Sequence, residues 1–394
     1  MINNLERNFI LQTNIYPLDV KNFDDVKKIC SRIKSDPRAL IYLAPKSNIL
    51  HFFAENIDYR AAAFLKQELL ARGGDTIVTK HVIDGKTDFS DVLLMATPSQ
   101  LKSLLEKLKA MDCWGLKNFR EALSEAFKKI NINKWIMKSP NGHEIIFDDN
   151  TKLMAIMNLT PDSFYDESRV KESEILSRAE KFLSEGAYIL DLGAESTRPG
   201  SEKVSEEEEL KRLIPSLKIL RKEFPDVLIS VDTYKPNVAK ISASEGADII
   251  NDISGFEFDE KMPEIVSELK IPYVLSHIKN DNEHYENLIG EINSYFNKKL
   301  NLLENENIIL DPGIGFGKNE DENFKIIKNI ESLKIFGLPI LVGHSRKRFT
   351  EKSLTGTLAV TAILNGHVNI LRVHDVKDNL NALLMARKIS EAEL

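Results

Sequence analysis

Eight short apolar runs constrain the fold of this chain more than any other feature. Each run ends in polar residues or glycine, and a segment with helical periodicity follows it. The runs are Leu153–Met157, Tyr188–Leu192, Val227–Val231, Asp248–Ile250, Tyr273–Leu275, Ile308–Leu310, Ile340–Val342 and Val368–Val373. The helical segments are Glu172–Glu185, Glu206–Glu223, Pro236–Glu245, Lys261–Leu269, Glu283–Glu304, Glu320–Ser332, Thr357–Asn365 and Asp378–Ser390. Apolar runs without alternation are typical of parallel strands covered on both faces.

Eight such units in succession predict an α/β protein with a closed (β/α)8 TIM barrel. A doubly wound open sheet is the alternative, but it usually has fewer units. Its glycine-rich dinucleotide fingerprint is also absent from the sequence. We therefore expect the barrel to occupy residues 138–394.

Residues 1–137 have a different pattern, which predicts a small α/β domain in front of the barrel. The expected strands are Ala39–Leu43, Ile49–Phe53, Thr76–Val82 and Val92–Met95, and the expected helices are Arg60–Ala71, Gln100–Met111 and Asn118–Lys129. Between Trp135–Lys138 and Glu144–Phe147, the pair Asn141-Gly142 indicates a two-residue hairpin turn. We expect this hairpin to lead into the barrel and to close its lower end.

Charge and composition exclude several classes of protein. The chain has 60 acidic and 53 basic residues and a net charge of −7, with no long basic stripe, so no nucleic-acid partner is expected. No apolar run reaches the roughly 18 residues that a membrane span needs. The first residues have no apolar core of a signal peptide, and the two cysteines have no short-range partner. These features predict a cytoplasmic protein with reduced thiols and no membrane partner.

Polar side chains cluster where the apolar runs end. In a barrel the carboxyl ends of all strands lie on one rim, where barrel active sites are built. The candidates there are Asn158, Asp232, Asn251, Asp311, Lys347, Arg372 and His374. Convergent carboxylates, an amide and a lysine can fix a flat, polar heterocycle by its edge. An arginine and a histidine beside an amide on neighbouring strands suit a phosphate group.

Each candidate also has a structural alternative. An Asp or Asn after a strand often caps the next helix, and this stays open for Asp232, Asn251 and Asp311 taken singly. Structural roles are favoured for Asp252 and Asp375. The stretch Gly313–Lys318 lacks both nucleotide-loop spacings, so its glycines are expected to let the backbone approach a flat ligand. No zinc motif and no acyl-enzyme nucleophile elbow occur.

Seven motifs together resemble those of the dihydropteroate synthase family. They are Asn158–Phe164 (NLTPDSF), Gly193–Gly200 (GAESTRPG), Ser230–Tyr234 (SVDTY), Ile250–Gly255 (INDISG), Asp311–Lys318 (DPGIGFGK), Ser345–Lys347 (SRK) and Arg372–Val376 (RVHDV). They occur in the family's order over about residues 140 to 390. The N-terminal domain resembles an extension that some archaeal and bacterial members carry.

The resemblance implies that dihydropterin hydroxymethyl pyrophosphate loses pyrophosphate while p-aminobenzoate attacks its methylene carbon. It implies that Asp232, Asn251, Asp311 and Lys347 hold the pterin. It also implies that Asn158, Arg372 and His374 hold the pyrophosphate, with Asn158 also ligating Mg2+. It assigns the aminobenzoate site to Thr197, Arg198, Phe316 and Ser345. The expected catalytic residues are Asp232, Asp311, Lys347, Arg372 and His374. A homodimer is also implied.

The sequence departs from the family pattern at several places. Tyr165–Ser168 stands where glycines are common, Ser276 where a methionine is frequent and Asn280 where a glycine is usual. The loop after Lys347 is short, which allows a larger arylamine, such as that of the methanopterin route. Two further alternatives are a pterin-dependent methyltransferase, whose motifs lack STRPG and SRK, and a binding protein without catalysis.

Overall fold

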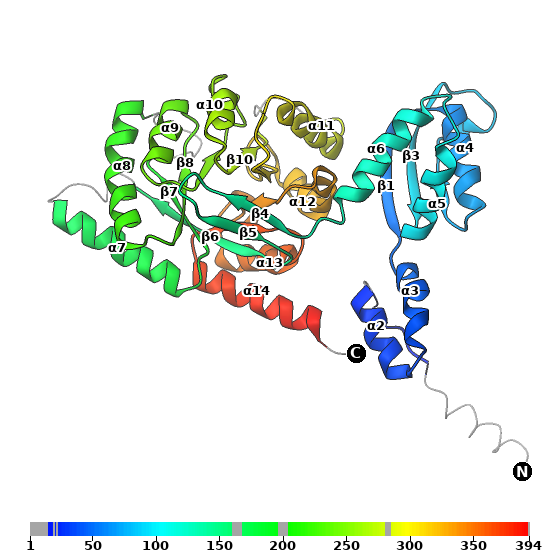
Figure 1. The fold of residues 1–394 in the computed structure, drawn as a ribbon, viewed down its shortest axis with the longest axis horizontal. Coiled ribbons are helices and arrows are strands. Elements are labelled where there is room, and N and C mark those ends of the chain that lie inside the picture. The colour runs from blue at the N-terminus through cyan, green and yellow to red at the C-terminus, as the bar shows by residue number, and fades with distance from the viewer. Residues whose placement is uncertain are drawn as a thin grey trace, which may run out of the picture. The chain divides into compact units, whose positions relative to one another are not determined.

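The computed structural model describes residues 15–18, 20, 23–159, 168–195, 204–279 and 285–392. The chain divides into two compact units, and the division falls between Glu125 and Ala126, inside helix α6. Figure 1 labels the helices and strands of both units. Among the described residues, no helix is long and apolar enough to cross a membrane.

The N-terminal unit is a three-stranded antiparallel sheet of order β1-β3-β2 with helices packed against it. Its elements are α2 (Phe23–Ile33), η1 (Pro37–Ala39), α3 (Leu40–Leu43), η2 (Ala44–Lys46), β1 (Leu50–Asp58), α4 (Tyr59–Leu70), β2 (Asp75–Ile77), η3 (Lys80–Val82), β3 (Phe89–Ala96), α5 (Pro98–Leu108) and α6 (Leu116–Lys129). The helices predicted at Arg60–Ala71, Gln100–Met111 and Asn118–Lys129 are present within a few residues.

The strand predicted at Ala39–Leu43 is wrong, because this segment is helical. The Asp36 carboxylate caps the helical turn that begins at Pro37, and Leu40–Leu43 continues it as α3. A proline at the first position favours a helix. The run Thr76–Val82 is a strand only as far as Ile77 and then forms the 3-10 turn η3.

The second unit is the predicted parallel barrel. Its strands are β6 (Lys152–Asn158), β7 (Ile189–Gly193), β8 (Leu228–Asp232), β9 (Ile249–Asp252), β10 (Tyr273–Ser276), β11 (Ile308–Asp311), β12 (Leu341–Val342) and β13 (Ile370–Val373). They form one sheet of order β11-β10-β9-β8-β7-β6-β13-β12. A parallel bridge between Leu310 and Ile340 joins the two ends, so the sheet closes.

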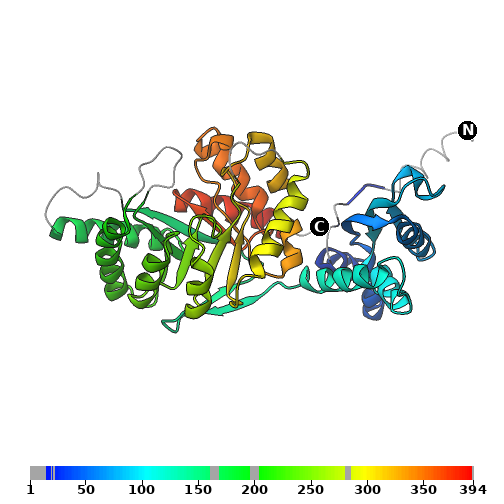
Figure 2. The same ribbon diagram turned by 90° about the horizontal axis from the view of Figure 1, so that it is seen from above.

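Helices cover the outside of the barrel, as Figures 1 and 2 show. They are α7 (Ser168–Ser184), α8 (Glu206–Glu223), α9 (Pro236–Ser244), α10 (Met262–Leu269), α11 (Leu288–Leu300), α12 (Glu320–Lys328), α13 (Leu354–Leu364) and α14 (Val376–Glu391), with 3-10 turns η5 (Ile330–Phe336) and η6 (Arg348–Thr350). The predicted helix Glu283–Glu304 is shorter than expected, since α11 begins only at Leu288, which Asn287 precedes as N-cap.

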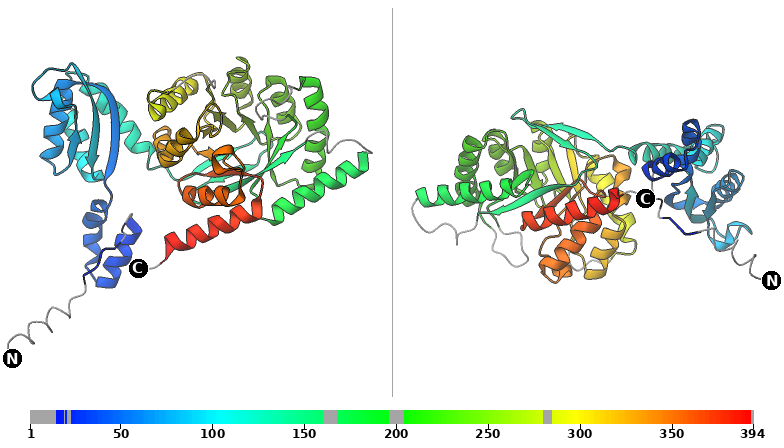
Figure 3. Two further views of the ribbon diagram at one scale, coloured as in Figure 1. Left: turned by 180° about the vertical axis from the view of Figure 1, so that it is seen from behind. Right: turned by 90° about the horizontal axis from the view of Figure 1, so that it is seen from below.

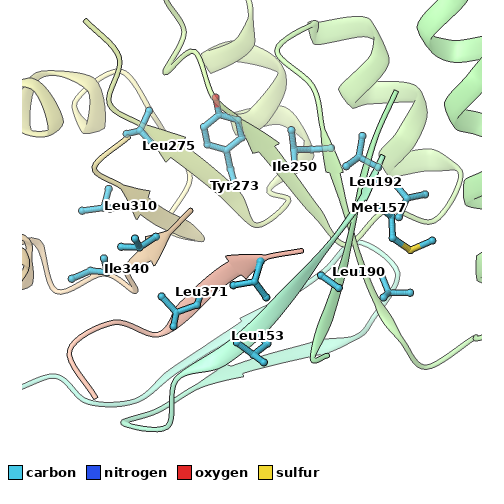
Figure 4. Packing of buried hydrophobic residues seen from close by; sticks show 14 of the residues in the cluster. Leu153, Met157, Leu190, Leu192, Ile250, Tyr273, Leu275, Leu310, Ile340 and Leu371 are labelled. Carbon is cyan, nitrogen blue, oxygen red and sulfur yellow. The ribbon is translucent and has the colours of Figure 1, made fainter. Parts of the chain in front are cut away.

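Two apolar layers hold the barrel together. The larger layer lies between the strands and the helices, and Figure 4 shows part of it around Leu190, Leu192 and Tyr273. The smaller layer lies inside the lower end of the barrel. Its barrel members are Met154, Ile189, Leu228, Ile249, Val274, Ile309, Leu341 and Ile370.

The predicted hairpin closes this lower end. Strands β4 (Trp135–Lys138) and β5 (Glu144–Phe147) pair in antiparallel fashion, and Figure 2 shows them along one end of the barrel. Their side chains Met137, Ile145 and Phe147 pack against the smaller apolar layer. The lower end is thereby filled with side chains, and the polar carboxyl end of the strands is the one available to ligands.

Candidate active site

The barrel interior changes from apolar to polar within two residues on most of the strands. Side chains two positions apart point to the same side of a strand. Each barrel residue of the smaller apolar layer is therefore followed, two positions later, by a residue that also faces the interior. Six of these eight are polar or charged, namely Asp191, Ser230, Asn251, Ser276, Asp311 and Arg372. This set is called the polar layer below.

Arg372 from β13 connects three strands across the polar layer. Its Nε donates to Asp191 Oδ2 on β7 at 2.5 Å, and its Nη2 donates to Asp232 Oδ2 at the end of β8 at 2.5 Å. Asn251 Nδ2 on β9 donates to the same Asp191 oxygen at 3.2 Å. The guanidinium has five N–H donors, so three remain for a ligand after these two bonds.

Three carboxylates and three cations share this end of the barrel. The carboxylates are Asp191, Asp232 and Asp311. The cations that interact with them electrostatically are Arg372, Lys347 and Lys318. Burial raises the pKa of Asp311, and the Gly313 N–H and the nearby lysines oppose this effect. Burial lowers the pKa of Lys347 to about 8 and that of Lys318 to about 7. The site therefore concentrates charge of both signs in a low-dielectric interior, where electrostatic interactions are strong.

Lys347 lies over the ring of Phe316, with its Nζ 3.8 Å from the ring centroid. The same Nζ donates to the Ile314 carbonyl at 2.8 Å. Both contacts hold the lysine against the loop that follows β11. A cation over an aromatic face is attracted to the electrons of the ring, and this attraction keeps the ammonium and the ring together at the rim.

The glycines of this loop are required by the internal packing of the protein, and their predicted role in approaching a flat ligand stays a prediction. A Cβ on Gly313 would lie 1.8 Å from the His277 carbonyl oxygen, and one on Gly315 would lie 2.7 Å from Lys347 Cδ. Both residues also have a positive φ. The loop needs glycine because it packs directly on the neighbouring loop and on Lys347. The need arises inside the protein and does not require a ligand.

The last two strand ends are tied together by side chains. Ser345 Oγ lies 3.1 Å from His374 Nδ1 and also accepts from the His374 backbone N–H at 3.2 Å. Arg346 forms a two-bond ion pair with Asp375, at 3.0 and 2.5 Å. Asp375 therefore positions the loop that carries Ser345 and Lys347.

The remaining predicted residues lie at the mouth or outside the described part. Asn158 is the last residue of β6, opposite Gly193 of β7. Thr197 and Arg198 lie outside the described residues, as do Tyr165–Glu167 and Asn280. Among the described residues, no group of three or more His, Cys, Asp or Glu could hold a metal ion.

Three other polar residues near the strand ends have internal partners. Asp252 accepts from the Tyr273 hydroxyl at 2.5 Å and from Ser254 N–H at 2.7 Å. His344 is fully buried, and its Nε2 lies 2.7 Å from Thr361 Oγ1 on α13. His277 packs among aromatic rings, 4.6 Å from that of Tyr295. Burial lowers the pKa of His277 to about 3 and that of His344 to about 4, so both are neutral at pH 7.

Sequence reasoning missed Asp191 and Lys318 as site residues. Asp191 lies within an apolar run, and only the even spacing Ile189, Asp191, Gly193 indicates that it faces the interior. Lys318 Nζ donates to the carbonyls of Gly313 and Phe316, both at 2.9 Å, and so folds the glycine loop back on itself. The sequence feature that could have indicated Lys318 is its position at the end of a stretch in which every second residue is glycine.

The chain matches the family described as "Pterin binding enzyme" over residues 154–374. It is 39% identical over 258 residues to a dihydropteroate synthase from Clostridium beijerinckii, a match that covers 61% of this chain and 95% of that protein. It is 31% identical over 394 residues to a bifunctional dihydropteroate synthase/dihydropteroate reductase from Helicobacter pylori, covering 94% and 98% of the two chains.

Solved structures of similar proteins cover the barrel. A dihydropteroate synthase from Xanthomonas albilineans with 4-aminobenzoic acid superposes with a TM-score of 0.59 at 30% identity. The match covers 65% of this chain and 99% of that chain.

Proposed function

The chain belongs to the dihydropteroate synthase family of pterin-binding enzymes, and we propose that its polar layer holds the pterin ring of the substrate. The enzyme is a transferase of folate biosynthesis that joins dihydropterin hydroxymethyl pyrophosphate to p-aminobenzoate and releases pyrophosphate. Use of a larger arylamine stays a prediction for this chain.

One observation carries the pterin proposal. Among the described residues, three buried oxygens of the polar layer have no hydrogen-bond partner: Asp191 Oδ1, Ser230 Oγ and Ser276 Oγ. Buried polar atoms are normally satisfied, so such a group indicates an occupant with complementary polar atoms. A pterin edge carries donors and acceptors of this kind, and Asp232, Asn251, Asp311 and Lys347 surround the same space.

The pyrophosphate is assigned to the mouth, where Arg372, His374 and Asn158 come from neighbouring strands β13 and β6. The three N–H donors that Arg372 keeps suit phosphate oxygens. Mg2+ fits this site, because it is usually held by one or two protein oxygens and by substrate phosphates. Asn158 supplies such an oxygen, and the bound ion would neutralise charge on the departing pyrophosphate.

Catalysis is then electrostatic. Cleavage of the carbon–oxygen bond leaves positive character on the pterin methylene and adds negative charge to the leaving group. Asp232 and Asp311 stabilise the positive charge on the methylene. The negative charge on the leaving group is stabilised by Arg372 and His374, and Lys347 orients the pterin ring. One preorganised group of this kind is worth ~3 kcal/mol in the barrier. The aminobenzoate is assigned to Phe316 and Ser345 with Thr197 and Arg198.

We also propose that the enzyme is a homodimer. Helix α13 reads LTGTLAVTAIL and has no charged side chain on any face, which is typical of a helix covered on more than one face. It packs on α14, and Figure 3 shows this outer part of the barrel. Ile363, Leu384, Met385 and Ile389 on these two helices are exposed. Light scattering should give twice the chain mass. The cytoplasmic location stays a prediction.

The reaction is tested by pyrophosphate release from dihydropterin hydroxymethyl pyrophosphate with Mg2+, with and without p-aminobenzoate. Release that requires the arylamine, together with dihydropteroate formation, supports the proposal. Release only with a larger arylamine would move the substrate assignment to that class. Absence of pterin pyrophosphate binding would refute the site.

A second activity is proposed because the similarity to the Helicobacter pylori enzyme spans both units of this chain. That relative is named as a dihydropteroate reductase as well. Here the reaction would add a hydride to carbon and a proton to nitrogen of one ring C=N bond, with a reduced nicotinamide or flavin as donor. Mass spectrometry of dihydropteroate incubated with the protein and each donor tests this. No product with two added hydrogens would exclude it.

A further inference from the structure

Two threonines one turn apart on α13 hold the loop between β12 and η6. Thr357 Oγ1 accepts from the Arg346 backbone N–H at 3.2 Å, and Thr361 Oγ1 lies 2.7 Å from His344 Nε2. Residues four positions apart on a helix lie on one face, so both hydroxyls are directed to the same loop. The loop is thereby bonded to α13 on either side of Ser345.

The hydrogen bonds of Thr361 have one possible direction. Its hydroxyl lies 2.6 Å from Asn379 Oδ1 on α14 and 3.1 Å from the Thr357 carbonyl oxygen, and both of these atoms can only accept. Nδ2 of the same amide donates to the Asp375 carbonyl at 2.7 Å, which fixes the orientation of the amide. His344 Nε2 must therefore carry a proton and donate it to Thr361. An ordered series of hydrogen bonds runs from the loop through α13 to α14.

The groups of this series are fully buried. His344, Thr357, Thr361 and Asn379 are all 0% exposed. A buried polar group that loses its partner keeps the whole cost of its removal from water, because no solvent can replace the lost bond. The series therefore favours a single arrangement of the loop against the two helices.

The loop between the two contacts has an uncommon backbone conformation. Arg346 has a φ of 55°, in the left-handed region that residues other than glycine rarely adopt. Such a conformation persists only where the surrounding structure holds it. The Thr357 hydroxyl binds the Arg346 N–H, and Asp375 binds its guanidinium. The turn at Arg346 is followed by Lys347, whose ammonium lies over the ring of Phe316.

We propose that Thr357 and Thr361 are positioning residues, which hold Ser345 and Lys347 in place for the substrates. This inference deepens the proposed function and rests on it, because Lys347 is assigned there to the pterin and Ser345 to the aminobenzoate. A misplacement of about 1 Å at a reacting site can cost about 100-fold in rate. Hydroxyls that fix the loop before the substrates bind prevent such a misplacement.

The test compares Thr357→Val and Thr361→Val with Thr151→Val in the full-length enzyme. Valine has nearly the volume of threonine and lacks the hydroxyl. Thr151 precedes β6 at the lower end of the barrel and is 5% exposed. Its hydroxyl donates to the Val368 carbonyl at 2.7 Å and accepts from the Gly366 N–H at 3.1 Å. The Thr357 hydroxyl also donates once and accepts once, so the control removes a matched pair of bonds far from the rim.

The kinetic effects should separate the two ends of the barrel. We expect kcat/KM for the pterin pyrophosphate to fall about tenfold or more in both α13 variants and to stay within about twofold in Thr151→Val. All three variants should have a lower melting temperature. The pH at which kcat/KM decreases should rise in the α13 variants, because a displaced Lys347 ammonium is closer to water. Thr357→Ser and Thr361→Ser keep the hydroxyl and should retain the wild-type rate.

Three results would overturn the inference. They are a wild-type kcat/KM in a folded α13 valine variant, an equal loss in Thr151→Val, and serine variants as slow as the valine ones. If Thr361→Val does not fold, Thr357→Val decides, because it unpairs only a partly buried backbone N–H of the loop. A wild-type enzyme without arylamine-dependent turnover would instead refute the proposed function, and the inference with it.

Discussion

Removing the guanidinium of Arg372 should destabilise the barrel in a way that depends on pH. The change Arg372→Met leaves Asp191 and Asp232 without their cation, and their side chains are only 0% and 6% exposed. Breaking a buried ion pair by removing one partner costs about 3–5 kcal/mol, because the remaining charge is buried and uncompensated. We expect a loss of ~4 kcal/mol in the free energy of unfolding at pH 7.

The pH dependence follows from the burial of Asp232. Burial raises the pKa of Asp232 to about 7 although the Arg372 guanidinium opposes this effect, so removing Arg372 raises this pKa further above its unfolded value. A folded pKa above the unfolded one means that the folded state binds more protons in this window. The stability of the variant therefore falls as pH rises from 4 to 7. Its deficit against the wild type should be nearly absent at pH 4.

Urea unfolding measures this in a Trp114→Phe background. The remaining tryptophan, Trp135, belongs to the barrel unit, and its indole N–H donates to the Gly337 carbonyl at 2.7 Å. Its fluorescence therefore reports on the barrel, which avoids treating two units as one transition. Turnover of Arg372→Met should fall by about 100-fold or more, the amount expected for one oriented donor.

Two further variants make the reasoning refutable. Arg346→Met removes an arginine whose side chain is 53% exposed in its pair with Asp375, so it should cost less than ~1 kcal/mol. Adding Asp191→Asn to Arg372→Met should restore part of the lost stability, because one uncompensated charge is then gone. A deficit of equal size at pH 4 and pH 7, or a double variant no more stable than Arg372→Met, would contradict the argument.

Three other predictions concern the site. The kcat/KM for the pterin pyrophosphate should decrease as pH rises through about 8, because the Lys347 ammonium then loses its proton, whereas Lys347→Arg should keep its activity beyond that pH. Gly313→Ala should lower the melting temperature more than Gly366→Ala, since both have positive φ but only the first Cβ meets a neighbouring oxygen. Equal losses would exclude the clash. Chelation of Mg2+ should stop pyrophosphate release, and added Mg2+ should restore it; full activity in chelator would remove the ion from the reaction.

Prediction from sequence worked best where periodicity was strong. The helix Glu206–Glu223 and the hairpin strands Trp135–Lys138 and Glu144–Phe147 were predicted with their observed bounds. Each begins or ends at a local signal, such as the Ser205 cap or the Asn141-Gly142 turn. The segment Ala39–Leu43 was mispredicted because a short apolar run fits a strand or a helix equally well. There the cap at Asp36 decided the outcome.

The sequence by itself determined the barrel and the rim on which its polar residues gather, because short apolar runs and helical periodicity are local properties of the chain. It placed Asp232, Asn251, Asp311 and Arg372 at strand ends without saying which of them meet. Only the tertiary structure brought Arg372 to Asp191 and Asp232, and His344 to Thr361. Such contacts depend on the stagger between strands and on the packing of loops. These come from long-range interactions that no single stretch of sequence contains.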